Sequence, residues 1–340
     1  VFVSPDSIRP LSQRVRYNSE LQSLDSTVHD YYGMGKGQIE SLNGRKLHNL
    51  GFMGQGMTIA VLDAGFMNVD KIAAFRNLTI KGTHNFVAGY DNDVYKEMDH
   101  GTKTLSTIAM NQPTVFVGTA PKADFWLLRT EDYSTESPAE EDFWIAAVEF
   151  SDSVGVDIIS SSLGYHGFDD ISMNYRYSDL NGRTAAISQA ASRLASKGMI
   201  LVNSAGNDGM GTWKKINVPA DAHDILTVGA VSLDKVNAPF SSIGPTADGR
   251  IKPDVMAYGC PTNVVSGRGY IIPDNGTSFA CPLIAGMVAC LWQACPNKSA
   301  KEILDIVRQS GNNCQSPDNI MGYGIPDFWS AYQSATRYNQ

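Results

Sequence analysis

Residues 58–65 read TIAVLDAG, an aliphatic run that ends in an aspartate followed by alanine and glycine. A short apolar run bounded in this way is typical of a strand that is buried on both faces of a sheet. Four further runs of the same kind follow at intervals along the chain. We expect strands at residues 58–62, 125–128, 157–160, 200–203 and 225–231.

Segments between these runs carry apolar residues at the three- and four-residue spacing of amphipathic helices. The clearest are residues 139–154 and 184–197, and Gly198 follows the second as a suitable C-cap. Buried strands that alternate with helices require crossover connections. We therefore predict an α/β fold of three layers: a doubly wound, mostly parallel central sheet covered by helices on both faces. No linker rich in Pro or Gly interrupts it, so residues 51–340 are expected to form one domain.

Residues 1–50 have a different character, being polar and containing two prolines and a cluster of glycines. Such a composition is typical of irregular structure. We predict that they form an N-terminal extension that wraps the main domain and contains at most one short helix. Residues 1–30 show no basic start, apolar stretch and small-residue cleavage site, so no secretory signal is recognisable there.

The charge balance argues against two classes of partner. The chain has 27 basic and 35 acidic residues, a net charge of -8, and no basic run interleaved with aromatic residues. We therefore expect no nucleic-acid partner. Apolar runs such as residues 199–202 fall far short of the ~20 residues that cross a bilayer, so we expect no membrane span.

The cysteines form no CxxC pair, which argues against a zinc ribbon or a thioredoxin-like site. An odd number leaves at least one thiol without a partner within the chain. Cys295 and Cys314 flank a predicted helix and could form a disulfide in an oxidising compartment, while buried apolar thiols are the favoured alternative. The five are Cys260, Cys281, Cys290, Cys295 and Cys314.

Residues 274–282 read DNGTSFACP and precede an apolar helical run, which places Ser278 at a helix start. Unpaired N–H groups and the helix dipole would stabilise an oxyanion there, although an ordinary N-cap serine fits the same pattern. A nucleophilic serine needs a histidine base and a carboxylate that orients it. His100 stands at another predicted helix start. Asp63 ends a buried strand, where an ionised carboxylate requires a partner.

The order Asp, His, Ser along the chain is that of subtilisin. Four segments, VLDAG at 61–65, HGT at 100–102, AGN at 205–207 and GTS at 276–278, resemble the signature segments of the subtilisin-like serine peptidase (subtilase) family. The resemblance covers roughly residues 50–335 and includes MGYG at 321–324, similar to the end-of-domain pattern of the family. It implies the subtilisin-like form of the predicted fold.

The resemblance implies a serine-type endopeptidase with polypeptide substrates. Ser278 would attack the scissile carbonyl, His100 would transfer the proton, and Asp63 would orient the imidazole. Asn207 would complete an oxyanion hole with the Ser278 N–H, a contribution of about 100- to 1,000-fold in a subtilisin. The family pattern also implies that an extended peptide binds by strand addition. The implied substrate-binding residues are Ser162, Leu163 and Gly164, the opposite strand Leu128-Arg129-Thr130, and Ala205 and Gly206.

Some positions depart from the family pattern. Ala64 stands where a Ser or Thr that could support the aspartate is common, and Lys103 replaces a frequent His. Cys281 and Leu283 also differ from the usual residues after the serine. None of these changes removes a catalytic group. A thiol about one helical turn from Ser278 suggests sensitivity to mercurials or oxidants.

Two acidic groups allow further interpretations. Residues 91–93 with Asp99 could suggest calcium, but their spacing does not fit an EF-hand, so a solvated acidic turn is favoured and no cofactor or metal site is expected. Glu131-Asp132 and Glu140-Glu141-Asp142 could select basic substrate side chains. A solvated helix N-terminus is the favoured interpretation.

Two other functions are alternatives to this interpretation. An esterase on an α/β-hydrolase fold would need a GxSxG segment and another residue order. A catalytically degenerate homologue that acts as a peptide-binding module remains the alternative to an active peptidase. The resemblance also implies that the protein acts outside the cytoplasm, after secretion or periplasmic export. It further implies an inhibitory pro-segment, which is not recognisable in this chain.

Overall fold

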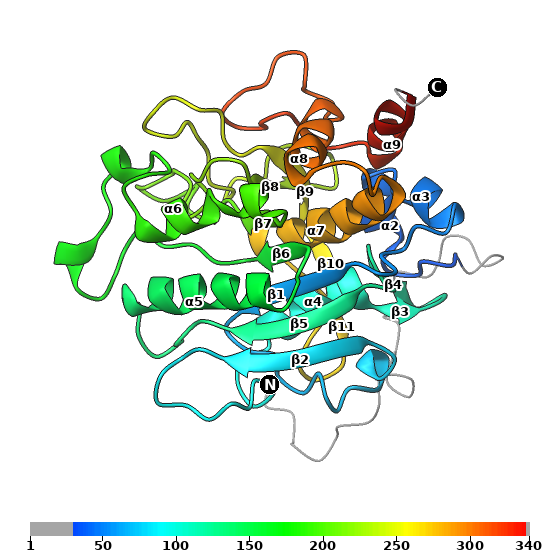
Figure 1. Cartoon of the computed structure of the whole chain (residues 1–340), viewed down its shortest axis with the longest axis horizontal. Coiled ribbons are helices and arrows are strands. Elements are labelled where there is room, and N and C mark those ends of the chain that lie inside the picture. Colours follow the sequence, from blue (N-terminus) through cyan, green and yellow to red (C-terminus); the bar gives the residue numbers. More distant parts are fainter. Residues whose placement is uncertain (1–29, 338–340) are drawn as a thin grey trace.

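A computed structural model describes residues 30–337 of the 340-residue chain. Its centre is a seven-stranded sheet in which all neighbouring strands run parallel (Figure 1). The predicted α/β class is confirmed. The strands lie in the order β2 (Thr79–Asn85), β5 (Asp124–Arg129), β1 (Thr58–Asp63), β6 (Ile158–Ser161), β7 (Ile200–Ser204), β8 (Leu226–Ser232) and β9 (Val255–Cys260).

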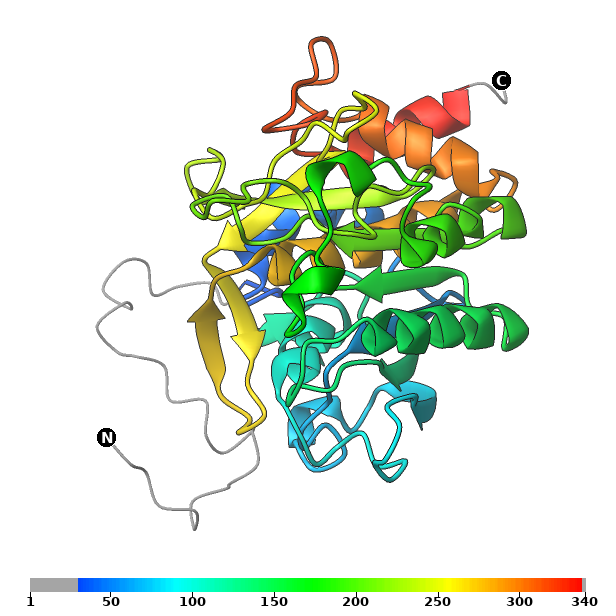
Figure 2. The same cartoon turned by 90° about the vertical axis from the view of Figure 1, so that its left-hand side faces the viewer.

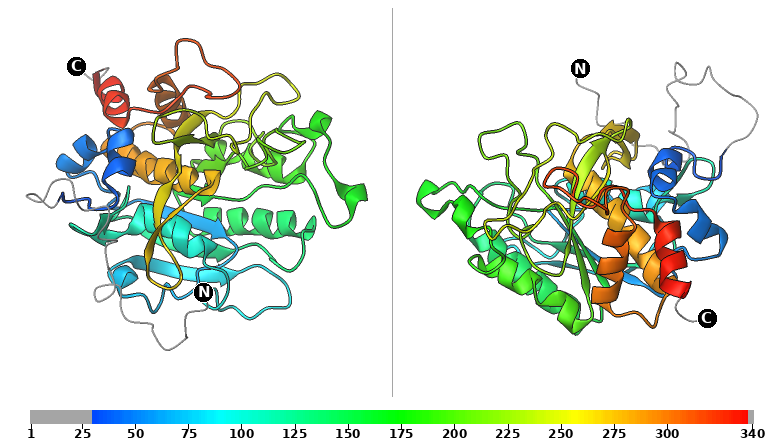
Figure 3. Two further views of the ribbon diagram at one scale, coloured as in Figure 1. Left: turned by 180° about the vertical axis from the view of Figure 1, so that it is seen from behind. Right: turned by 90° about the horizontal axis from the view of Figure 1, so that it is seen from above.

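Alternating side chains of β1 supply two separate cores. Ile59 and Val61 pack into one hydrophobic cluster, whereas Ala60 and Leu62 pack into the other. This is the two-residue period of a strand that is buried on both faces. Helices cover the two faces, as the view from above shows (Figure 3). One face carries α5 (Ala139–Ser153) and α6 (Ala186–Ala191), and the other carries α4 (His100–Ala109), α7 (Thr277–Ala294), α8 (Ala300–Gln309) and α9 (Phe328–Arg337).

All five predicted strands exist, with ends within one residue of the expected positions. The sequence patterns missed β2 and β9. β2 is a half-exposed edge strand without clear apolar alternation, and β9 includes a tyrosine, a glycine and a cysteine. The helix predicted at 184–197 is divided into α6 and a 3₁₀ turn, Leu194–Lys197, and Gly198 ends it in the left-handed conformation, at φ 88°.

Two small antiparallel pairs complete the strands: β3 (Asn111–Gln112) with β4 (Phe116–Val117), and β10 (Thr262–Val265) with β11 (Ile271–Asp274). The β10–β11 hairpin stands out from the sheet in Figure 2. β10 contacts α4, and β11 leads directly into the start of α7. The hairpin therefore connects two helices whose first residues carry candidate catalytic groups.

The part of the N-terminal extension that lies within the structure packs closely on the domain. Residues 1–29 of the predicted extension lie outside the described residues. Residues 30–50 contain α2 (Lys36–Ser41) and α3 (Arg45–Asn49), so the expectation of at most one short helix is wrong. Buried side chains in and beside these helices, Ile39, Leu42 and Leu47, belong to the α7-side core.

α7 is the one helix among residues 30–337 whose length and composition would suit a membrane span. It is longer than the apolar runs on which the expectation of no membrane span rested. Most of α7 is buried inside the domain, with contacts to β6, β7, β8 and β9. These contacts make it the central core helix of its layer.

All five cysteines are free thiols, so Cys295 and Cys314 are not joined. Cys281, Cys290 and Cys295 are buried. The alternative of buried thiols therefore holds for these three, and Cys260 and Cys314 are partly exposed.

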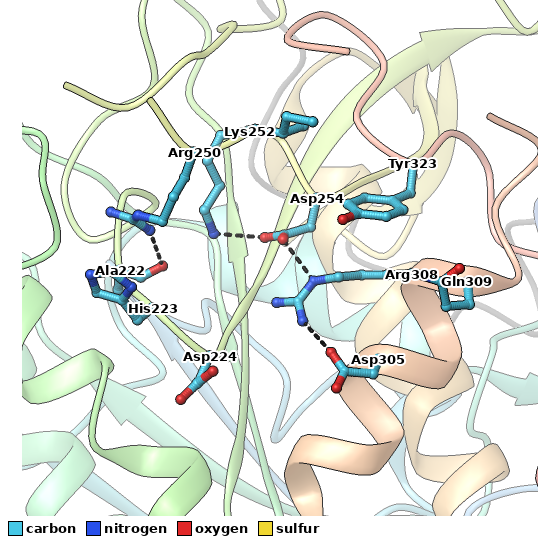
Figure 4. A pocket seen from close by; sticks show the side chains of 11 residues that line it. Ala222, His223, Asp224, Arg250, Lys252, Asp254, Asp305, Arg308, Gln309 and Tyr323 are labelled. Carbon is cyan, nitrogen blue, oxygen red and sulfur yellow. Dashed lines mark hydrogen bonds and ion pairs between the residues drawn. The ribbon is translucent and has the colours of Figure 1, made fainter. Parts of the chain in front are cut away.

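A buried ion network lies at the amino end of β9 and lines a cavity of ≈ 330 Å³ (Figure 4). The Asp254 carboxylate accepts from Lys252 Nζ at 2.7 Å and from Arg308 Nε at 2.9 Å. Burial disfavours the Asp254 charge, but the two cations outweigh it and hold the pKa of Asp254 below its ordinary value. This network ties α8 to the sheet.

We predict that Asp254→Asn lowers the free energy of unfolding by about 3–5 kcal/mol, because it leaves Lys252 buried without its counter-charge. Urea denaturation at neutral pH measures this loss. Asp305→Asn is the matched control, since Asp305 also bonds Arg308 but is 74% exposed. It should change stability by less than about 1 kcal/mol. Equal losses in the two variants would contradict the prediction.

Candidate active site

Three candidate residues come from separate elements at the carboxyl edge of the sheet. Asp63 is the last residue of β1, His100 is the first residue of α4, and Ser278 is the second residue of α7. α4 and α7 contact each other on one face of the sheet (Figure 3). In open parallel sheets this edge is where binding crevices form.

A glycine allows α4 to start against the end of β1. Gly101 N–H donates to Gly65 O at 3.0 Å. A Cβ at Gly101 would collide with that oxygen and with the Phe66 ring. Because glycine has no Cβ, the helix can approach the strand closely enough to place His100 beside Asp63.

The Asp63 carboxylate is fully buried and accepts three hydrogen bonds. Its Oδ1 accepts from His100 Nδ1 at 2.7 Å and from Ala64 N–H at 2.8 Å. Its Oδ2 accepts from Thr104 Oγ1 at 3.0 Å. Sequence reasoning missed Thr104. Its position four residues after His100, on the same helix face, was the signal that could have found it.

His100 connects the buried aspartate to the open side of the site, with a side chain that is 32% exposed. Its Nδ1 is bonded to Asp63, so Nε2 is the nitrogen left for a reacting group. Burial disfavours the imidazolium, but the charge and hydrogen bond of Asp63 outweigh burial and raise the pKa of His100 above its ordinary value of 6.5. The ring also lies beside Phe279, at 5.7 Å between centroids.

Ser278 is 8% exposed and lies in the first turn of α7. Its backbone N–H has no hydrogen-bond partner within residues 30–337. Its Oγ lies 3.5 Å from Ser162 O, and Ser162 Oγ donates to Ser278 O at 2.8 Å. The serine hydroxyl is thus turned toward Ser162 rather than hydrogen-bonded to His100 in this structure.

The Asn207 side chain is oriented by the residue before the serine. Its Oδ1 accepts from Thr277 N–H at 2.9 Å and from Thr277 Oγ1 at 3.0 Å. With the oxygen held, the Nδ2 amide group must point the other way and has no partner within the described part of the chain. The exposed Asn207 and the Ser278 N–H are therefore two free donors near one serine hydroxyl.

Five of the predicted substrate-binding residues lie near Ser278. Ser162 bonds Ser278 directly, as described, and Leu163 and Gly164 continue the same segment after β6. Gly206 N–H is 3.3 Å from Thr277 Oγ1, and Ala205 precedes it as a buried residue. Gly206 has φ 107°, and a Cβ there would press on Ser242, so glycine is required.

Leu128 and Arg129 do not form a binding strand, contrary to the prediction. Both residues belong to β5, which pairs with β1 on one side and β2 on the other as far as Arg129. Both residues are buried. A strand that is paired on both sides has no free edge for a peptide. Overlooking β2 caused this error.

Two of the unusual residues now have clear environments. Lys103 Nζ lies 3.1 Å from Asp274 and 3.4 Å from Asp99, so it links α4 to the end of β11. Cys281 is fully buried, and burial raises its pKa to about 12. A buried thiol that stays protonated is unreactive. The structure therefore argues against the suggested sensitivity to mercurials.

The acidic turn at residues 91–93 is neutralised by a nearby lysine. Lys96 Nζ lies 2.7 Å from Asp91 and 3.4 Å from Asp93, at exposed positions. Asp99 instead pairs with Lys103. Among residues 30–337, no group of three or more His, Cys, Asp or Glu side chains is arranged to hold a metal ion.

The second acidic group is only partly solvated: Asp142 is exposed, whereas Glu140 and Glu141 are buried, contrary to the expectation of a solvated helix start. Glu140 and Glu141 are 2% and 5% exposed. Glu140 accepts from two backbone N–H groups of the preceding loop, and Glu141 accepts from the Tyr175 hydroxyl. Glu131 accepts from the Tyr165 hydroxyl. The segment 165–175, which follows the Ser162 segment, therefore supplies the hydroxyl donors of Glu131 and Glu141.

Burial raises the pKa of Glu131 to about 8 and that of Glu140 and Glu141 to about 7. The folded state therefore binds more protons than the unfolded state above the ordinary value of 4.5. The contribution of these groups to the free energy of unfolding is therefore largest at acidic pH, where they are protonated. It declines as the pH rises toward 8.

Glu131→Gln should reduce the loss of thermal stability between pH 6 and pH 9, because the variant has no carboxyl to ionise while its amide oxygen still accepts from Tyr165. Melting curves at both pH values measure the effect. The control is Glu149→Gln, which removes an exposed carboxylate from α5. If both variants lose as much thermal stability between pH 6 and pH 9 as the wild type, ionisation of Glu131 does not cause the loss.

We also expect the His100 imidazole to titrate above pH 6.5, and Asp63→Asn to lower its pKa, because the variant removes the charge that opposes burial. NMR titration of the histidine ring signals measures both values. Asp99→Asn should change the His100 pKa much less, because Asp99 precedes His100 by one residue but does not bond its ring. A His100 pKa unchanged by Asp63→Asn would contradict the prediction.

Comparison with solved structures agrees with the fold. The crystal structure of MycP1 from Mycobacterium smegmatis superposes with a TM-score of 0.68 and 21% identity, covering 91% of this chain and 86% of that chain. At this identity the likeness concerns the fold, a parallel sheet flanked by helices.

Sequence comparison identifies the family. Subtilisin NAT from Bacillus subtilis subsp. natto is 28% identical over 283 residues, covering 83% of this chain and 67% of the relative. Subtilisin Savinase from Lederbergia lenta is 27% identical over 280 residues, covering 82% and 91%. The subtilase family pattern matches residues 54–324, most of the described domain. The chain therefore belongs to the subtilase family.

Proposed function

We propose that this chain is a serine endopeptidase that hydrolyses peptide bonds of polypeptides through an acyl-enzyme on Ser278. The observation that carries the proposal is the 2.7 Å hydrogen bond between His100 Nδ1 and the buried Asp63. It holds the imidazole in one tautomer with Nε2 facing the open side, as a general base requires. Family membership supports the same chemistry.

In the first half of the reaction, Ser278 Oγ turns from Ser162 O toward His100 Nε2, transfers its proton and attacks the scissile carbonyl carbon. The imidazolium is stabilised by Asp63. When the tetrahedral intermediate collapses, the C–N bond breaks and His100 delivers the proton to the leaving amine. An ester of Ser278 remains.

Water then hydrolyses the acyl-enzyme with the help of the same side chains. His100 takes a proton from the water as its oxygen attacks the ester carbonyl. When the second intermediate collapses, its bond to Ser278 Oγ breaks and Oγ recovers a proton from His100. The carboxylic acid product is then released.

The negative charge of both intermediates would be stabilised by two donors, the Ser278 N–H and Asn207 Nδ2. Thr277 fixes the Asn207 amide before the reaction, so no reorganisation is needed as charge develops. The residue next to the nucleophile thus also orients the oxyanion donor.

We further propose that an extended peptide lies along Ser162, Leu163 and Gly164, with Ala205 and Gly206 on the other wall of the primary pocket. Strand addition to such a segment favours polypeptides over small esters. The proposal includes action outside the cytoplasm and regulation by a pro-segment, both carried by family likeness, and no cofactor takes part in the steps above.

A fluorophosphonate probe tests this proposal. The wild-type protein should be labelled and should cleave fluorescent casein, while Ser278→Ala and His100→Ala should lose labelling, with cleavage reduced by about a million-fold for the serine variant. Ser153→Ala, which changes an exposed serine at the end of α5, should keep both activities. A folded wild-type protein that binds peptides without labelling or cleavage would be a degenerate binding module instead.

A further inference from the structure

We propose that Thr104 is a positioning residue that supplies to Asp63 the hydroxyl support that Ala64 does not offer. The inference rests on the proposed catalytic roles of Asp63 and His100. Subtilases commonly have a Ser or Thr directly after the aspartate, whereas this chain has Ala64. A hydroxyl from α4 bonds the same carboxylate at Oδ2, whereas Ala64 N–H bonds Oδ1.

The Thr104 hydroxyl has one proton and two acceptors within reach. Asp63 Oδ2 lies at 3.0 Å and Gly101 O at 3.1 Å. Hydrogen bonds to an ionised acceptor are stronger than those between neutral groups. The proton is therefore directed to Asp63 whenever the carboxylate is charged.

This bond is the sole one made by Asp63 Oδ2 within residues 30–337, since the other two donors both bond Oδ1. Asp63 is 0% exposed, so water does not replace a lost donor. A buried carboxylate oxygen without a donor is costly and leaves the group free to rotate about its bond to Cβ. Such rotation would tilt the His100 ring out of line with Ser278 while the carboxylate charge stays beside the ring.

One helix thus contacts the carboxylate at both oxygens. His100 and Thr104 lie one turn apart on α4, and their side chains bond Oδ1 and Oδ2 respectively. The helix fixes the distance between these two donors. The orientation of the Asp63 carboxylate plane is therefore determined by α4, which also carries His100.

Thr104 also affects the charge that His100 experiences. Its hydroxyl dipole points the positive end at Asp63 and partly offsets the carboxylate charge. Removing it should therefore raise the pKa of His100, while Lys103 and Asp274, the other charged groups that influence the ring, stay in place.

The test compares Thr104→Val with Thr104→Ser. The valine variant keeps the shape but loses the hydroxyl, so we expect kcat to fall about tenfold, with KM little changed. The acid limb of kcat/KM should move to higher pH. The serine variant should stay within about twofold of the wild type. Thr107→Val is the matched control, because it removes an equally buried α4 hydroxyl that bonds Thr104 O and not the site.

A second variant separates positioning from general damage. Adding Ala64→Ser to Thr104→Val should restore most of the lost kcat, because a hydroxyl returns beside Asp63. NMR titration of His100 in the Ser278→Ala background gives a readout that needs no activity, so it tests Thr104 even if the protein proves not to be a peptidase. A folded Thr104→Val protein with wild-type kcat and wild-type His100 pKa would overturn the inference.

Discussion

The candidate active site is organised around a carboxylate that has no access to water. Asp63 ends an interior strand of a sheet that is covered on both faces, so its charge must be balanced by donors from the protein alone. Those donors come from the next residue and from α4, which in turn requires glycines where helix and strand meet. The positions of the helix, the base and the supporting threonine all follow from this need.

The second constraint is the pairing of two helix starts. α4 and α7 pack against each other in one core, and each carries a candidate catalytic residue in its first turn. Lys103 joins α4 to the end of β11, immediately before the Ser278 segment. Core packing and one ion pair therefore set the relative position of the proposed base and nucleophile, although the two residues are distant in sequence.

Much of this arrangement could be predicted from the sequence, because strands buried on both faces leave continuous apolar runs and because the four family segments include Asp63, His100, Asn207 and Ser278. What failed depended on neighbours distant in the chain. The assignment of Arg129 to a substrate strand failed because β2 has no apolar alternation, so its pairing with β5 went unseen. Glu141 was predicted to be solvated because nothing near it in the sequence indicates that the Tyr175 hydroxyl donates to it. The sequence around Thr104 does not distinguish it from other helical threonines, because its role depends on the contact of α4 with the end of β1.

The division of β1 between two cores has a further consequence for a protein that would digest polypeptides. Ile59 and Val61 belong to one core, and Ala60 and Leu62 to the other, so neither helical layer can detach without exposing this strand to water. Opening either layer would expose an apolar face of this strand, which places such openings at the costly end of local unfolding. Because proteases cut chain segments that are exposed or locally unfolded, the shared strand would keep both cores closed to cleavage by a neighbouring copy.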